Sequence, residues 1–157
     1  MTRVVKIEKT GDPEVLKIEN IKIEQPGPDE ALIETKAIAL NFIDCYHRSG
    51  LYPVKLPSGI GLEASGIIKK VGTKVKDLTV GDHVAYISAP IGAYAEERVM
   101  PVNKLVKIPT EISLEVAATI MTKGLTTHYL LHKTYPVKAN DIILYHAAAG
   151  GVGQIFC

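Results

Sequence analysis

The chain ends in the run Ile142-Ile143-Leu144-Tyr145-His146-Ala147-Ala148-Ala149-Gly150-Gly151-Val152-Gly153-Gln154-Ile155-Phe156-Cys157. Its first four residues form an apolar segment of strand length, a glycine turn follows, and a helix is expected after the turn. Strand, glycine turn and helix in this order open a dinucleotide-binding unit, because glycine lets a pyrophosphate approach unpaired N–H groups at a helix N-terminus. One βαβ unit needs about 30 residues. Residues 140–157 are therefore predicted to be the first strand and glycine turn of an incomplete α/β domain.

The part of the chain that precedes this turn contains short segments in which apolar and polar residues alternate. The segments that we expect to be strands are residues 3–8, 16–24, 31–39, 64–72, 81–86, 93–100 and 104–108. Residues 41–50 are expected to form a short helix, with Asp44 near its start and Gly50 at its end. Many short strands separated by glycine and proline turns are typical of a closed or nearly closed β-barrel.

The pattern changes after Pro109. Ser113 is suited to cap a helix that starts at Leu114, and a helical period returns from Thr126 onward after an interruption near Gly124. We therefore divide the chain into a β-rich domain at residues 1–110, a helical connector at 111–139 and the start of the α/β domain at 140–157.

Composition excludes several classes of partner. Lysine and arginine total 18 and acidic residues 17, a formal net charge of +1, which offers no basic patch for nucleic acid or for an anionic membrane. Two cysteines, Cys45 and Cys157, cannot form a disulfide framework, so we expect a reducing compartment, the cytoplasm. No stretch approaches the roughly 20 apolar residues of a membrane span.

Five separated blocks resemble one family, in the same order along the chain. The blocks are Lys36–Asp44, Arg48–Pro53, Leu56–Gly66, Lys123–Thr126 and His146–Gly153. They are similar to the NADPH:quinone oxidoreductases, the zeta-crystallin-like, zinc-free branch of the medium-chain dehydrogenase/reductase superfamily. The resemblance implies a GroES-like β-barrel domain followed by an incomplete Rossmann domain, here as an N-terminal fragment. It also implies hydride transfer from NADPH to a quinone or enone in the cleft between the domains, and a homodimer for the parent protein.

The resemblance assigns the cofactor contacts to two regions. Gly150, Gly151, Val152 and Gly153 form the turn that receives the pyrophosphate, with Ala148 where the usual fingerprint begins with glycine. Lys123 and Thr126 lie where the connector passes the cofactor in the family, so that Thr126 is expected to contact the nicotinamide carboxamide and Lys123 to face the cleft. The alternative for the turn is a loop whose glycines only allow helix and strand to pack, and for Lys123 a solvated side chain.

The resemblance also predicts that no metal is bound. Zinc-dependent relatives have a cysteine ligand where Asn41 stands and a histidine ligand where Leu62 stands, and leucine cannot coordinate zinc. The charge that develops on the substrate oxygen must then be met by hydrogen-bond donors. The candidates are Asn41, which is also expected to contact the cofactor, and the phenols of Tyr46 and Tyr52. Their alternative is structural: Tyr46 in the core and Tyr52 packed beside Pro53.

Three other functional hypotheses remain open at this point. The chain by itself could be a catalytically silent β-barrel fragment without turnover, because it carries no contact for an adenosine or ribose. A zinc alcohol dehydrogenase is disfavoured by Leu62. An RNA-binding or crystallin-like structural role, which some relatives have acquired, finds no support in the near-neutral charge.

Overall fold

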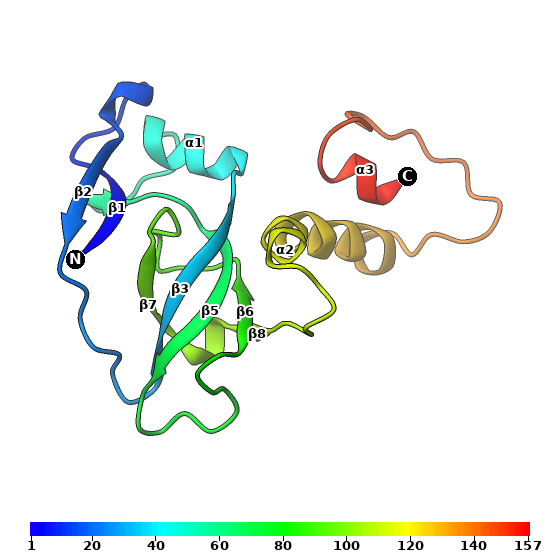
Figure 1. Ribbon diagram of the computed structural model, residues 1–157. Coiled ribbons are helices and arrows are strands. Elements are labelled where there is room, and N and C mark those ends of the chain that lie inside the picture. Colours follow the sequence, from blue (N-terminus) through cyan, green and yellow to red (C-terminus); the bar gives the residue numbers. More distant parts are fainter.

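The computed structural model describes residues 1–157 as a β-rich body followed by a long helix and a short C-terminal turn-helix segment (Figure 1). One sheet has the strand order β2-β1-β4 and the other β7-β3-β5-β6-β8. The strands are β1 (Thr2–Ile7), β2 (Lys17–Ile21), β3 (Glu30–Ala39), β4 (Ser58–Gly59), β5 (Glu63–Val71), β6 (His83–Tyr86), β7 (Glu97–Pro101) and β8 (Val106–Lys107). The helices are α1 (Phe42–Ser49), α2 (Leu114–Tyr129) and α3 (Gly153–Phe156), with 3-10 turns at Pro13–Val15 and Val102–Lys104.

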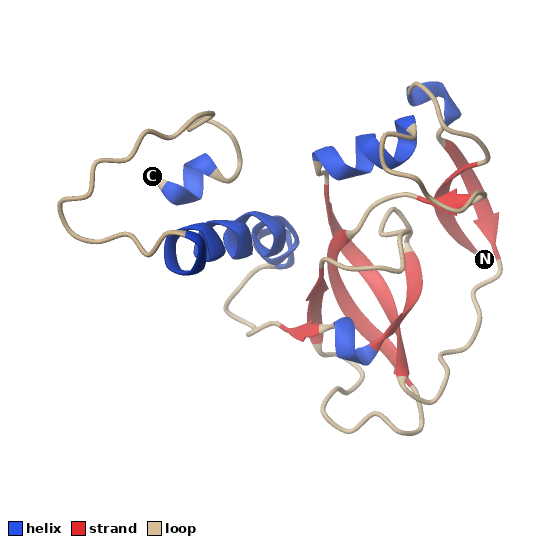
Figure 2. Cartoon of the chain, turned by 180° about the vertical axis from the view of Figure 1, so that it is seen from behind, coloured by secondary structure: helices blue, strands red, loops and turns tan.

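The two sheets are joined into a nearly closed barrel, as the alternating segments predict. Val4 forms an isolated antiparallel bridge with Ala95, and the neighbouring N–H of Val5 donates to the carbonyl of Tyr94 at 2.8 Å. The interior is filled by apolar side chains that come mostly from β3, β5, β6 and β7 of the five-stranded sheet. These are Ala31, Ile33, Ala64, Ile68, Leu78, Val84, Tyr86, Ala93 and Met100. Figure 2 shows that all the strands belong to this body.

The pairing of β3 with β5 positions the residues that matter below. These strands run antiparallel with Ala39 opposite Glu63, so the C-terminal end of β3 meets the N-terminal end of β5. The register shifts twice, between Leu32 and Ile33 and between Thr35 and Ala37, which marks β-bulges. Bulges bend the strand and increase its twist, and β3 curves strongly across the barrel in Figure 1. As a result, the segment after Ala39 lies directly beside Glu63.

Helix α1 begins and ends where its sequence predicts. The Asp44 carboxylate accepts a hydrogen bond from the backbone N–H of Asn41 at 3.0 Å, so the first turn is closed by a side chain three residues along. The helix stops at Gly50, whose φ of 87° is left-handed, and the Gly50 N–H donates to the carbonyl of Tyr46. Glycine adopts this conformation without the steric cost of a Cβ atom.

Helix α2 differs from the sequence expectation because it is continuous through Gly124. The Ser113 hydroxyl accepts from the Val116 N–H at 3.2 Å, which confirms the predicted N-cap. Glycine inside a helix costs only about 1 kcal/mol relative to alanine, and packing of the buried Ala117 and Thr127 outweighs that cost. The predicted interruption occurs instead after Tyr129, where five residues form a π-helical turn at Leu130–Thr134.

The C-terminal segment contains the predicted turn and helix but not the predicted strand. Residues 141–145 form no β-ladder, whereas residues 147–152 turn and α3 begins at Gly153. A strand exists only through hydrogen bonds to a neighbouring strand, and no other segment of the chain pairs with residues 141–145. Figure 1 shows α3 returning to the side of α2 after a long loop.

None of the helices is long and apolar enough to span a membrane.

Candidate active site between the barrel and helix α2

A buried carboxylate lies at the junction of β3, β5 and α2. Glu63, the first residue of β5, has none of its surface exposed. One carboxylate oxygen accepts from Nδ2 of Asn41 at 2.7 Å, and the other accepts from the backbone N–H of Thr122 at 2.7 Å. Both oxygens of Glu63 are thus hydrogen-bonded, and these bonds replace the hydration that a carboxylate loses when it is buried. The carboxylate thereby links the end of β3 to the middle of α2.

Lys123 extends this chain of hydrogen bonds toward the glycine turn. Its Nζ donates to Oδ1 of Asn41 at 3.2 Å, so the amide of Asn41 is held between a carboxylate and an ammonium group. The aliphatic stem of Lys123 lies against Gly151: a Cβ atom at Gly151 would stand 2.7 Å from both Cδ and Cε of the lysine. Only a residue without a side chain leaves this space for the stem. The sequence-predicted residues Asn41, Lys123 and Gly151 are thus neighbours.

A second buried carboxyl group, Asp44, lies on α1 next to this cluster. One oxygen accepts from the Asn41 N–H and from the hydroxyl of Tyr94, each at 3.0 Å, while the other oxygen and the buried Nδ1 of His47 have no partner. Burial raises the pKa of Asp44 above its usual value, and the two hydrogen bonds and the nearby His47 oppose this only in part. Burial and the adjacent Asp44 also raise the pKa of Tyr94, so Tyr94 stays a neutral donor.

The two predicted tyrosines form an aromatic pair at the other side of α1. The rings of Tyr46 and Tyr52 lie 5.2 Å apart between centroids, and the Tyr52 N–H donates to the carbonyl of Tyr46 at 3.1 Å. Phe42 stacks on Tyr46 at 6.4 Å and is 80% exposed, while Tyr52 is 48% exposed. Neither phenol ring belongs to the main core cluster. Their hydroxyl groups are not hydrogen-bonded within the chain, so both are free to donate to another molecule.

The glycine turn is attached to α2 by a threonine that the sequence reasoning did not select. The hydroxyl of Thr127, which is 5% exposed, lies 2.9 Å from the Lys123 carbonyl and 3.4 Å from the carbonyl of Val152. Its neighbour Thr126 is only half-buried and makes no such contact with the turn. A polar residue one helical turn after Lys123 is the only sequence signal that could have pointed to Thr127.

Within the turn itself, Gly153 is the glycine that packs against the backbone of the turn. A Cβ atom at Gly153 would overlap the backbone of Ala148, so the turn can close only with glycine there. Gly150 and Gly151, in contrast, are exposed. The turn therefore offers a bare backbone surface, which is what a pyrophosphate needs.

No group of three or more histidine, cysteine, aspartate or glutamate side chains comes together in a way that could hold a metal ion. At the two positions where zinc-dependent relatives are expected to have ligands stand Asn41 and Leu62. Asn41 is committed to Glu63 and Lys123.

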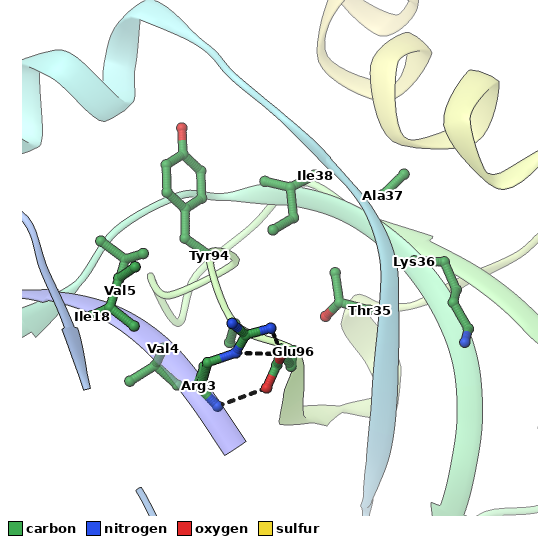
Figure 3. A pocket seen from close by; sticks show the side chains of 11 residues that line it. Arg3, Val4, Val5, Ile18, Thr35, Lys36, Ala37, Ile38, Tyr94 and Glu96 are labelled. Atoms are coloured by element: carbon green, nitrogen blue, oxygen red, sulfur yellow. Dashed lines mark hydrogen bonds and ion pairs between the residues drawn. The ribbon is translucent and has the colours of Figure 1, made fainter. Parts of the chain in front are cut away.

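A hollow of about 480 Å³ lies on the barrel surface between β1, β2 and the end of β3. It is lined mainly by apolar side chains, with the Arg3–Glu96 ion pair at one end (Figure 3). The ring of Tyr94 borders this hollow, and its hydroxyl points away from the ion pair (Figure 3) and reaches Asp44. Tyr94 is therefore the residue shared by the hollow and the candidate site.

Comparison with known proteins places these features in context. Residues 27–110 match the model of the alcohol dehydrogenase GroES-like domain. The chain is 48% identical over 158 aligned residues to a quinone oxidoreductase of Pseudomonas aeruginosa, covering 100% of this chain and 49% of the relative.

Two solved structures are similar over the whole chain. A quinone oxidoreductase of Pseudomonas syringae has a TM-score of 0.95 at 50% identity and is covered over 49% of its length. An Escherichia coli quinone oxidoreductase complexed with NADPH has a TM-score of 0.95 at 47% identity and is covered over 48%. The chain thus spans about half the length of the relatives it matches. The likeness confirms the predicted fold class, a GroES-like β-rich domain followed by the beginning of an α/β domain.

Proposed function

Because the chain belongs to the family of the alcohol dehydrogenase GroES-like domain, we propose that it forms the substrate-side half of an NADPH-dependent quinone oxidoreductase. The observation that carries this proposal is the meeting of Asn41, Lys123 and Gly151 at one place. This meeting joins the barrel to the glycine turn in a chain similar over its full length to quinone oxidoreductases. We keep the proposed division into residues 1–110, 111–139 and 140–157, and the cytoplasm as the proposed location.

The residues present fit a reduced nicotinamide dinucleotide. The exposed backbone of Gly150 and Gly151 supports the proposal that a phosphate group binds at this turn, because no side chain would stand between the phosphate and the backbone N–H groups. Lys123, which reaches Asn41 on the barrel, and Thr126 of α2 are the proposed neighbours of the nicotinamide ring. NADPH, when bound, supplies the hydride. Support for NADPH as the cofactor comes from the Escherichia coli relative, whose structure is a complex with NADPH.

The protein's own part in the reaction is to orient the substrate and to meet the negative charge that develops on its oxygen. Asn41, Tyr46 and Tyr52 are the proposed groups. The unpartnered phenols of Tyr46 and Tyr52 can donate hydrogen bonds, and their rings can stack on a flat quinone or enone. A preorganised donor of this kind typically contributes a factor of about 10²–10³ in rate.

The first test measures turnover by the full-length protein, by which we mean this chain together with the rest of the α/β domain that the proposal requires. We expect NADPH to be oxidised in the presence of a benzoquinone, and replacement of Tyr52 by phenylalanine to lower kcat by about 100-fold, because the ring remains but the donor is lost. Tyr135→Phe is the matched control, since Tyr135 is 59% exposed and lies far along the chain from α1. Absence of NADPH oxidation by the wild-type protein with both quinones and enones would refute the proposed function.

The zinc-free character of the proposed enzyme needs its own measurement. We expect elemental analysis of the purified full-length protein to give far less than one zinc per chain, and turnover to survive prolonged treatment with a chelator. Stoichiometric zinc that is lost together with activity would instead indicate a zinc alcohol dehydrogenase.

A further inference from the structure

We propose that Glu63 is a positioning residue that fixes the orientation of the Asn41 amide and, through it, holds the ammonium group of Lys123 as a further donor for the substrate oxygen. This inference rests on the proposed function and deepens it. Its basis is one continuous chain of contacts: Glu63 to Asn41 at 2.7 Å, and Asn41 to Lys123 at 3.2 Å.

The chemistry of the three groups permits only one arrangement. An ionised carboxylate can only accept hydrogen bonds, whereas an amide has a donor end and an acceptor end. Because Glu63 faces the amide, Asn41 must turn its Nδ2 toward the carboxylate and its Oδ1 away from it. Oδ1 is then the acceptor for the ammonium group of Lys123.

Two further contacts keep this arrangement from shifting. The second oxygen of Glu63 is bound by the N–H of Thr122, so the carboxylate cannot rotate without losing a buried hydrogen bond. The stem of Lys123 is confined by Gly151 on the turn side. An ammonium group has three hydrogens, and Asn41 uses one of them. Two donors of Lys123 are therefore not used by Asn41 and remain available to the substrate oxygen.

Both ends of the Asn41 amide are engaged in this arrangement, so a positioning role replaces the donor role proposed for Asn41 above, while Tyr46 and Tyr52 remain proposed donors. The positioning role can be tested by exchanging the carboxylate at position 63 with the amide at position 41. Glu63→Gln leaves an amide facing an amide, so one of the two must flip, and a flipped Asn41 presents its NH₂ to the ammonium group. Asn41→Asp alone brings two carboxyl groups into contact. The double variant Glu63→Gln/Asn41→Asp restores every bond. Its new glutamine accepts from Thr122 and donates to the new aspartate, and that aspartate accepts from Lys123.

We expect each single variant of the full-length protein to lose about tenfold or more in kcat, by analogy with the loss seen when a residue that orients a metal ligand is replaced. The double variant should regain most of that loss, although the side chain at position 41 can then no longer donate. Glu34→Gln is the matched control, because Glu34 pairs with Lys36 and Lys69 on the barrel surface. A double variant no more active than the worse single variant overturns the inference.

A second readout needs neither cofactor nor turnover. In the full-length protein without NADPH, the amine of Lys123 should react slowly with acetic anhydride, and faster in Glu63→Gln, as followed by mass spectrometry of its peptide. The double variant should return the reaction to the slow rate, with the exposed Lys74 as internal reference. If wild-type protein lacks quinone turnover but shows this labelling pattern, the proposed function fails while the positioning by Glu63 stands. Turnover with equal labelling in all variants would refute the positioning by Glu63 and leave the proposed function standing.

Discussion

Glu63 and Asp44 are both buried carboxyl groups, yet their oxygens are hydrogen-bonded to different extents. Both oxygens of Glu63 are hydrogen-bonded, whereas one oxygen of Asp44 is buried without a partner. Burial therefore dominates at Asp44 and raises the pKa of its carboxyl group from 3.8. Asp44 is held in this place because it caps α1 and accepts from Tyr94. The same carboxyl group that caps α1 is therefore poorly solvated.

The raised pKa of Asp44 predicts how stability changes with pH. We take 3.8 as the pKa of Asp44 in the unfolded chain, and the pKa in the folded protein is higher. At pH values between the two, the folded protein binds more protons at Asp44 than the unfolded chain does. The contribution of Asp44 to the free energy of unfolding therefore falls as pH rises. Asparagine does not titrate. The stability of Asp44→Asn relative to wild type should therefore improve from acid to neutral pH, measured by urea unfolding at both.

The control for this prediction has the opposite sign. Lys107 holds the pKa of Asp82 below its usual value through a 2.8 Å ion pair, so the stability from Asp82 is present above that range and lost in acid. Asp82→Asn should become less stable relative to wild type as pH rises, and only slightly, because the pair is solvated. The same pH trend in both variants would contradict the assignment.

At the scale of elements, the close crossing of β3 and β5 depends on a single glycine. A Cβ atom at Gly66 would overlap the carbonyl of Glu34 and come within 2.8 Å of Cγ2 of Ile33. Both neighbours belong to β3, which is paired on both sides by β7 and β5, and Ile33 is fully buried, so neither can move freely. This contact lies at the bulged part of the ladder that brings Asn41 beside Glu63.

We therefore expect Gly66→Ala to lower the free energy of unfolding by about 2 kcal/mol or more, because backbone of a core strand must shift. Gly124→Ala is the matched control: the new methyl group would meet Cγ1 of Ile120 at 3.0 Å, but Ile120 is 44% exposed and its side chain can rotate away. Urea unfolding of both variants measures the difference. Equal losses of stability would show that the close crossing at Gly66 is not rigid.

The elements that the sequence predicted correctly are those with a local signal. Period-two alternation located the barrel strands, and Ser113 and Gly50 marked helix boundaries by their capping chemistry. The interruption predicted near Gly124 was wrong, because the cost of a glycine inside a helix is small compared with the stabilisation from packing along α2. The strand expected at residues 142–145 failed for a different reason: an apolar run specifies a strand only where a partner strand is present.

At the scale of the whole molecule, the site arises from three distant stretches of the chain. Lys123 donates a hydrogen bond to Asn41, from which it is separated by 82 positions in the sequence. Thr122 donates to Glu63 across a separation of 59 positions. Residue types at these positions could be selected from the sequence through the family resemblance. Their hydrogen-bond partners could not, because the β3–β5 register and the docking of α2 on the barrel decide them. Glu63 and Thr127 were accordingly not among the site residues selected from the sequence.

The segment that fails to form a strand gives the last prediction. Ile142 is 101% and Leu144 85% exposed, and Ile143 between them is 43% exposed, which leaves consecutive apolar side chains in water. Exposed apolar segments with unpaired backbone groups associate with one another. The 157-residue chain should therefore form concentration-dependent oligomers in light scattering, and Ile142→Lys/Leu144→Glu should shift it toward monomer. Val80→Lys is the control, since Val80 is also solvent-facing at 64% but lies at the end of a barrel turn. Oligomers that survive the double substitution would locate the association on the barrel instead.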